Sequence, residues 1–160
     1  MKVLVVYDTV SYMRLTEKVA EAIEAVLKEK GVEVDLFFFK NMDKTIIRNY
    51  DCVLVGAPTL SFRASSGIMQ FLSSLPSNEF SGKLAAAFDT QMQSRLSGSA
   101  IKGIEGKLKV LGFKLVTTPL VTYVEGKASE MQLKEGELEK AKNWAKAIVD
   151  TLSKASSLQK

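Results

Sequence analysis

The sequence predicts an α/β protein in which helices cover both faces of a five-stranded parallel sheet. Apolar runs of strand length alternate with helical patterns along all 160 residues, which is typical of parallel strands joined by helical crossovers. The first run, 3–7 (VLVVY), is unbroken and rich in β-branched residues, as in a central strand buried on both faces. We expect one domain over residues 1–155, followed by a flexible tail over 156–160.

The other elements follow in order from local patterns. Further strands are expected at 32–39, 52–57, 83–89 and within 114–124. Pro58 is expected to end the third strand. Helices are expected at about 16–30, 42–49, 65–75, 99–111 and 134–154. The long helices each carry one apolar stripe, and Trp144 lies beside the last of these stripes, so we interpret it as a core residue.

The loop after the first strand has the composition of an anion site. Hydroxyl side chains stand at Thr9, Ser11 and Thr16, and Thr16 is expected to cap the first helix. The free N–H groups and the positive dipole end of a helix start attract anions. We therefore expect a phosphate in this loop, with ordinary turn and cap residues as the alternative interpretation.

The composition limits the catalytic and redox roles that the side chains can take. The chain has no histidine, and so it lacks the usual general base near neutral pH. Cys52 is the sole cysteine, which excludes an internal disulfide, and its place at the start of an apolar strand favours a structural role. Any chemistry is therefore expected to belong to a bound cofactor.

The charge pattern bears on partners and location. The net charge is +4, but the lysines are scattered along helices among glutamates, which indicates solvated faces and no nucleic-acid site. No run approaches the roughly 20 apolar residues of a membrane span. We therefore expect no membrane partner and a cytoplasmic location.

Three loops are expected to meet at the carboxyl ends of the strands, where ligands bind in sheets of this kind. They cover residues 8–16, 58–66 and 89–99. The first loop has neither the glycines of a dinucleotide fingerprint nor a P-loop. Asp8 stands alone, without the carboxylate cluster of a phosphoacceptor domain, and the histidine of a cobalamin domain is missing.

Nearly the whole chain resembles the flavodoxin family in element order, length and hydroxyl loop. The segments 85–91 (AAAFDTQ), 97–104 (SGSAIKGI) and 133–144 (LKEGELEKAKNW) look like a branch of flavodoxin-domain proteins. The resemblance implies a flavodoxin-like fold with strand order 2-1-3-4-5. It also implies noncovalent FMN, with the phosphate in the first loop and the isoalloxazine ring between the other two. The cofactor contacts that it implies are Thr9, Val10, Ser11, Tyr12, Arg14, Leu15, Thr16, Pro58, Thr59, Leu60, Ser61, Phe62, Asp89, Thr90 and Gln91.

Two of these residues have distinct expectations. Phe62 is the one aromatic residue in the two ring-binding loops, so it is expected to contact the ring, with a core position as the alternative. Arg14 stands in a loop that departs from the family pattern of hydroxyl, any, hydroxyl, Gly, any, hydroxyl, because this loop is longer by two residues and has no glycine. Either Arg14 adds a charge-assisted contact to the phosphate, or the site binds FMN weakly or not at all.

Three functions remain open at this point. The first is an electron carrier that acts with a redox partner protein. The second is an NAD(P)H-dependent FMN or quinone reductase, which the longer loop favours, and the third is a binding module that has lost flavin. Arg63 and Arg95 are expected to flank the ring, and this positive field predicts a less reducing flavin than in acidic flavodoxins and an acidic redox partner.

Overall fold

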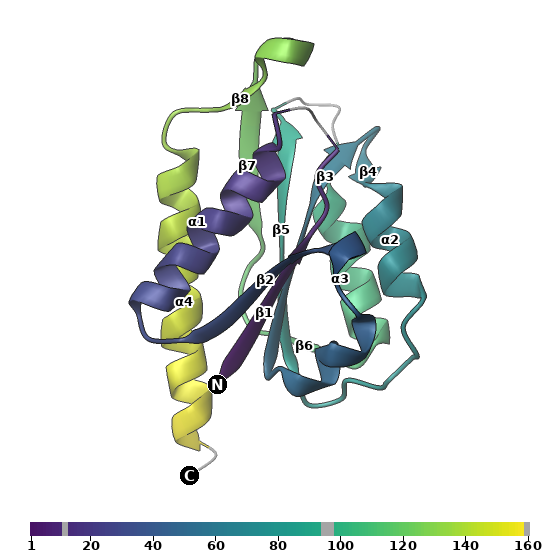
Figure 1. Ribbon diagram of the computed structural model, residues 1–160, viewed down its shortest axis with the longest axis vertical. Coiled ribbons are helices and arrows are strands. Elements are labelled where there is room, and N and C mark those ends of the chain that lie inside the picture. Colours follow the sequence, from purple (N-terminus) through teal and green to yellow (C-terminus); the bar gives the residue numbers. More distant parts are fainter. Residues whose placement is uncertain (11–12, 94–97, 159–160) are drawn as a thin grey trace.

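The computed structural model describes residues 1–10, 13–93 and 98–158, and its centre is one mostly parallel sheet (Figure 1). The strand order is β2-β1-β3-β5-β7-β8. The five long strands are parallel to their neighbours: β1 (Lys2–Tyr7), β2 (Glu33–Phe38), β3 (Cys52–Leu60), β5 (Leu84–Met92) and β7 (Leu120–Glu125). The predicted fold class and the order 2-1-3-4-5 are therefore confirmed.

Three strands of two residues each enlarge the sheet beyond the five predicted strands. The strands β4 (Arg63–Ala64) and β8 (Gln132–Leu133) run antiparallel to β3 and β7, and β6 (Lys114–Leu115) runs parallel to β5. Such short pairings leave no periodic pattern in a sequence. The region 114–124, expected to contain one strand, therefore holds both β6 and β7.

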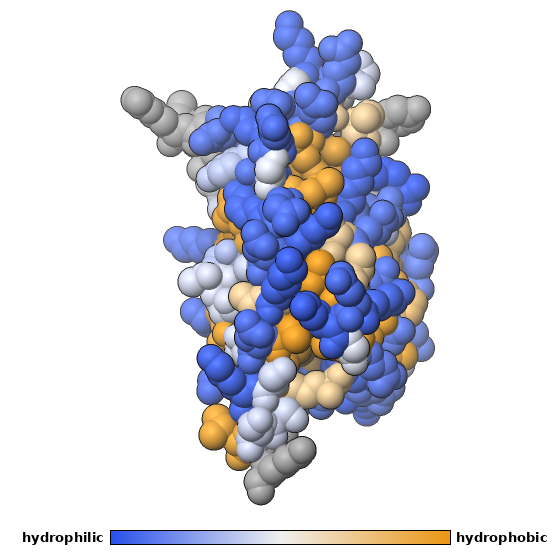
Figure 2. Space-filling model, turned by 90° about the vertical axis from the view of Figure 1, so that its left-hand side faces the viewer, coloured by the Kyte–Doolittle hydropathy of each residue, from blue (hydrophilic) through white to orange (hydrophobic). Residues whose placement is uncertain are grey.

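Helices cover the two faces of the sheet, as predicted. Figure 1 shows α1 (Leu15–Glu29) and α4 (Glu137–Leu158) on one face and α2 (Ser66–Ser73) and α3 (Ala100–Val110) on the other. Each pair closes over its own cluster of buried apolar side chains. Figure 2 views the side of α1 and α4, where hydrophilic side chains dominate the outer surface and apolar groups show between them. The helical lysines on this side therefore belong to a solvated surface.

The short helices and the end of the last helix differ from the prediction. The expected helix over 42–49 is a 3₁₀ helix (Lys44–Asn49), and a second one precedes it (Phe39–Asn41), while a third (Ala128–Glu130) follows β7. The last helix continues to Leu158, so residues 156–158 of the expected flexible tail form its final turn. Residues 159–160 lie outside the described residues.

Pro58 does not end the third strand, because β3 continues through it to Leu60. The last ladder bond toward β1 runs from the Asp8 N–H to the Gly56 carbonyl, at 3.0 Å. Pro58 lies beyond that bond and pairs in register with Thr90 on the other side. A proline without an N–H is tolerated at this position because the neighbouring strand has already turned away.

The two residues interpreted as structural are buried. Burial raises the pKa of the Cys52 thiol to about 12, so the thiol stays protonated and unreactive. The Trp144 ring packs in the α1–α4 core and its indole N–H donates to the Thr118 carbonyl at 2.8 Å.

Candidate functional site

The loops after β1, β3 and β5 meet at the carboxyl end of the sheet, at the top of Figure 1. Side-chain hydrogen bonds join the first loop to the other two. Ser65 Oγ, just before α2, donates to Asp8 Oδ2 at 2.5 Å. The hydroxyls of Thr16 and Thr90 lie 2.8 Å apart and are both buried. These contacts hold the start of α1 against β5 and the start of α2 against the end of β1.

Asp89 is the centre of a hydrogen-bond network that joins the ends of β3 and β5 to the start of α3. Its carboxylate is fully buried, and its Oδ2 accepts from Gln91 Nε2 at 2.7 Å. The same oxygen accepts from the hydroxyls of Thr59 and Ser99, each at 3.0 Å. Thr59 in turn accepts from the Ala100 N–H at 2.8 Å, which fixes the first turn of α3. Burial raises the pKa of Asp89, and the three donated hydrogen bonds act against this shift.

The start of α1 differs from the expectation. Thr16 is not the helix cap, because α1 begins at Leu15 and the cap position is Arg14. Arg14 makes no side-chain capping bond; its guanidinium pairs with Glu17 at 2.8 Å instead. The N–H groups of the first turn therefore receive no acceptor from the capping side chain, and within the described residues this helix start is suited to an anion.

Arg14 has a φ of 52°, in the left-handed region that favours glycine. It stands two residues before Thr16, the last hydroxyl of the loop. In the family pattern given above, that position is the glycine. The loop therefore keeps a glycine-like conformation without the glycine.

The turn between β3 and β4 is also unusual. Its two central residues, Ser61 and Phe62, have φ values of 48° and 70°, as in a type I′ hairpin turn. Such turns favour Asn and Gly, and a bulky aromatic residue there is an outlier of the kind that concentrates at ligand sites. The turn exposes 57% of Phe62, which excludes the core alternative for this residue.

Most of the expected cofactor contacts fall into two groups by burial, while Thr9 and Thr59 are half-buried and Arg14 is exposed in its ion pair. Exposed side chains form a rim at the loop ends: Val10, Leu60, Ser61 and Phe62, with Met92 beside them. The side chains of Leu15, Thr16, Pro58, Asp89, Thr90 and Gln91 are buried, so they support the site from below. Ser11 and Tyr12 lie outside the described residues, as does Arg95.

Sequence reasoning missed three residues that hold the loops in place. Asp8 and Ser65 bond to each other across 57 positions of the chain, and Thr122 donates to the Asp89 carbonyl at 2.6 Å. The positions of Asp8 at a strand end and of Ser65 before a helix were the available signals. Their pairing has no local signature.

Two unpartnered buried atoms test whether FMN fits. Among the described residues, Thr9 Oγ1 and Asp89 Oδ1 are buried side-chain oxygens without a hydrogen-bond partner. A buried polar atom of this kind is costly unless a ligand or water satisfies it. Thr9 lies in the first loop and also lines a cleft of about 770 Å³ beside it. The free hydroxyl, the uncapped start of α1 and the apolar rim suit the phosphate and the ring of FMN.

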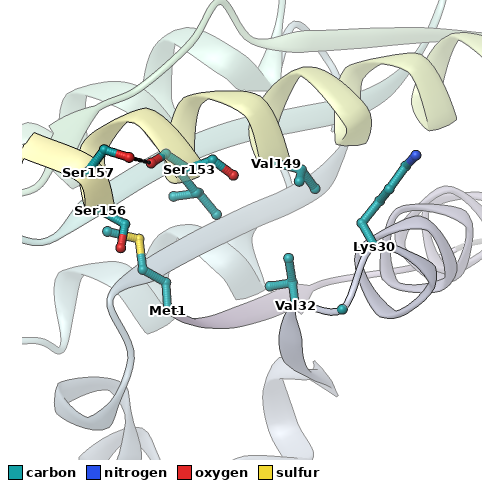
Figure 3. Close-up of a pocket in the computed structure, with 9 residues that line it drawn as sticks. Met1, Lys30, Val32, Val149, Ser153, Ser156 and Ser157 are labelled. Atoms are coloured by element: carbon teal, nitrogen blue, oxygen red, sulfur yellow. Dashed lines mark hydrogen bonds between the residues drawn. The ribbon is translucent and has the colours of Figure 1, made fainter.

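A cavity far from these loops lacks such features. It has a volume of about 360 Å³ and lies between the end of α1 and the last turns of α4 (Figure 3). Ser157 donates to the Ser153 carbonyl there, at 3.0 Å, and Lys30 is the one charged side chain among the described residues that line it. The cavity therefore offers no anion or ring site comparable to the loop end.

Comparisons with known proteins identify the family. The flavodoxin family model matches residues 5–144, so the chain belongs to the flavodoxin family. A solved flavodoxin from the domain Archaea superposes with a TM-score of 0.79, covering 96% of this chain and 99% of that one, at 23% identity. Flavodoxin 2 from Bacillus cereus gives a TM-score of 0.78 over 94% and 99% of the two chains, at 26% identity.

One curated relative adds a point about length. An uncharacterized protein of Methanocaldococcus jannaschii is 30% identical over 155 residues, which is 93% of this chain and 36% of the relative. The chain spans about a third of the length of the curated relatives that it matches.

The chain is accordingly an FMN-binding protein of the flavodoxin family. Members of this family pass electrons to redox partner proteins. Within the part of the chain that the structure describes, no helix combines the length and the apolar character needed to cross a membrane.

Proposed function

We propose that this chain is a redox carrier that holds FMN noncovalently at the three loops, within a flavodoxin-like domain over residues 1–155. The phosphate would be held by Thr9, Arg14 and the first N–H groups of α1. Leu60, Ser61 and Phe62 would border one side of the ring, and the end of β5 the other. When bound, FMN supplies the electron-accepting and electron-donating chemistry that the chain's own side chains lack.

One observation carries this proposal: among the described residues the buried Thr9 hydroxyl has no hydrogen-bond partner, and it stands in the loop that leads to α1, whose cap residue makes no side-chain capping bond. The N–H groups of a helix start and an unpartnered hydroxyl in the preceding loop can both donate hydrogen bonds to a phosphate. Arg14 has an exposed side chain that can turn from its ion pair with Glu17, and Glu17 then keeps its hydrogen bond from the Tyr7 hydroxyl. The arginine is thus available to the phosphate.

FMN binding tests the proposal directly. FMN is titrated with the flavin-free protein, and quenched flavin fluorescence with a shifted visible band is the expected result. Riboflavin, which lacks the phosphate, should bind at least tenfold more weakly. Thr9→Val should weaken FMN binding and leave riboflavin binding unchanged, whereas Thr151→Val in α4 is the matched control. Equal affinity for the two flavins, or no spectral change at saturation, would contradict the phosphate assignment.

The charge of the chain supports an acidic partner and a less reducing flavin. The net charge is +4, and Arg63 is exposed directly after the Ser61–Phe62 turn. A positive potential at the ring favours electron uptake by the flavin. A potentiometric titration of the FMN-loaded protein should therefore give a higher midpoint than in acidic flavodoxins, and Arg63→Glu should lower it.

A reductase is the second candidate, because the first loop is two residues longer than the flavodoxin pattern. NADH or NADPH added to the FMN-loaded protein without oxygen distinguishes the two. Rapid bleaching of the flavin would establish the reductase, and a stable yellow solution is expected for the carrier.

A further inference from the structure

A groove of about 790 Å³ runs between α2 and α3, on the face of the sheet opposite α1 and α4. Its floor is apolar and includes Ala64, Met69 and two glycines of α3. Phe62 and Val110 line the groove, and each of these residues is 57% exposed. The lining includes residues from Ser99 to Val110, so the groove follows the length of α3, which is about 16 Å.

Gly106 is the residue that keeps this groove open. A glycine inside a helix is less favourable than alanine, because the unfolded chain gains more freedom and no side chain packs. Packing explains the glycine at position 103, because a Cβ there would lie 3.3 Å from Met69 Cε. A Cβ at Gly106 would meet nothing within 4 Å, so the neighbouring structure does not require the glycine. The groove itself is what a side chain at this position would fill.

The charges that line the groove are all positive. Arg63, Lys102 and Lys107 line it, and no Asp or Glu stands among the described lining residues. Within the described part of the chain, none of the three cations takes part in a salt bridge, whereas Arg14, Arg48 and Lys140 each do. An apolar floor between unpaired cations is complementary to a segment with an apolar side chain flanked by carboxylates.

We propose that this groove docks an acidic segment of an electron-transfer partner protein. The inference rests on the proposed function, since the groove begins at Phe62, on the rim where the flavin ring would lie. A partner segment seated along α3 would therefore end beside the ring. An apolar side chain of the segment would lie over Gly106, and its carboxylates would pair with Lys102 and Lys107, as in helix-in-groove recognition.

Charge reversal with a matched control tests the electrostatic part. The probe is an acidic [2Fe–2S] ferredoxin, and its binding to the FMN-loaded protein is measured by calorimetry at low salt. Lys102→Glu/Lys107→Glu should weaken binding by about tenfold or more and should flatten its salt dependence. The control, Lys109→Glu/Lys142→Glu, makes the same change in net charge at exposed sites outside the groove, and it should have a much smaller effect.

Groove filling tests the steric part. Gly106→Leu should weaken ferredoxin binding by about tenfold, whereas Gly106→Ala, which adds one methyl group, should have little effect. Both variants are expected to fold, because the position has open space around it. Circular dichroism and FMN affinity are measured on each variant as checks that the fold and the cofactor site are intact.

The outcomes separate this proposal from the proposed function. Absence of saturable ferredoxin binding by the wild type, or equal losses in the groove and control variants, would overturn the groove proposal while FMN binding stands. Self-association of the chain that Gly106→Leu abolishes would also overturn it, because a second copy would then be the occupant. If FMN does not bind, the proposed function fails, and ferredoxin binding to the flavin-free protein still decides whether the groove docks an acidic partner.

Discussion

The left-handed conformation of Arg14 leads to a prediction about stability at the phosphate loop. Arg14→Gly and Arg14→Ala both remove the same guanidinium and the same ion pair with Glu17. They differ only in how well the new residue tolerates a φ of 52°. The left-handed region costs a residue with a Cβ roughly 1–2 kcal/mol. Glycine avoids that cost, but its unfolded chain gains entropy worth roughly 0.5–1 kcal/mol.

The difference between these terms sets the expected result. Arg14→Gly should be more stable than Arg14→Ala by about 0.5–1 kcal/mol in the free energy of unfolding. Urea denaturation of both variants without flavin measures it. Glu105 supplies the control, because it lies in the middle of α3 with no positive φ. There the order should reverse, with the alanine variant more stable by about 1 kcal/mol.

The same pair of variants reports on the cofactor. If Arg14 contacts the phosphate, both variants should bind FMN about tenfold more weakly than the wild type, and riboflavin binding should not change. An alanine variant as stable as the glycine variant would refute the argument that the loop keeps a glycine-like conformation at a cost. Unchanged FMN affinity in both would refute the role of the guanidinium.

Three further predictions concern buried groups. Gly56→Ala should destabilise the protein by roughly 1–3 kcal/mol in urea denaturation, because its Cβ would lie 2.0 Å from the buried ring of Phe88; an unchanged midpoint would show that the ring can move. The Cys52 thiol, with a pKa of about 12, should react with a thiol reagent only as fast as the protein unfolds, and rapid labelling of the native protein would contradict its burial. Burial raises the pKa of Asp89 in the folded state, so the folded state binds this proton more tightly than the unfolded chain does. The resulting stabilisation is fully present below the unfolded pKa of about 3.9 and is lost as the pH rises through the folded pKa. Asp89→Asn should lack this component in a pH series of denaturation curves, and identical profiles for the two proteins would count against it.

Much of the fold could be predicted because its signals are local. The unbroken apolar run at 3–7 and the stripes of the long helices report burial on two faces and on one face, whatever the rest of the chain does. Pro58 misled the prediction because its effect depends on whether a neighbouring strand needs its missing N–H. At this position β1 has already ended, and only the assembled sheet shows that.

The candidate site likewise has features that the sequence predicts and features that only the folded chain shows. The hydroxyl loop, the two crevice loops and the exposed aromatic Phe62 could be found in the sequence, because loops after buried strands are recognised by composition. The cap of α1 could not be predicted from the sequence. The local pattern favours Thr16 as the cap, but its hydroxyl is buried and hydrogen-bonded to that of Thr90, 74 positions away. The sequence likewise showed only that the loop has no glycine, and not that Arg14 takes the left-handed conformation at that position.

The amino-acid sequence was enough to predict the class of fold, the order of the strands and a bound cofactor in a chain without histidine. Which buried polar groups have hydrogen-bond partners, in contrast, became visible only in the folded chain. Asp8 accepts a hydrogen bond from Ser65, and Asp89 accepts hydrogen bonds from Thr59 and Ser99. Thr9 Oγ1 has no hydrogen-bond partner among the described residues. The physical reason is that periodicity and composition act along the chain, whereas hydrogen-bond partners and open grooves depend on which segments the packed sheet brings together.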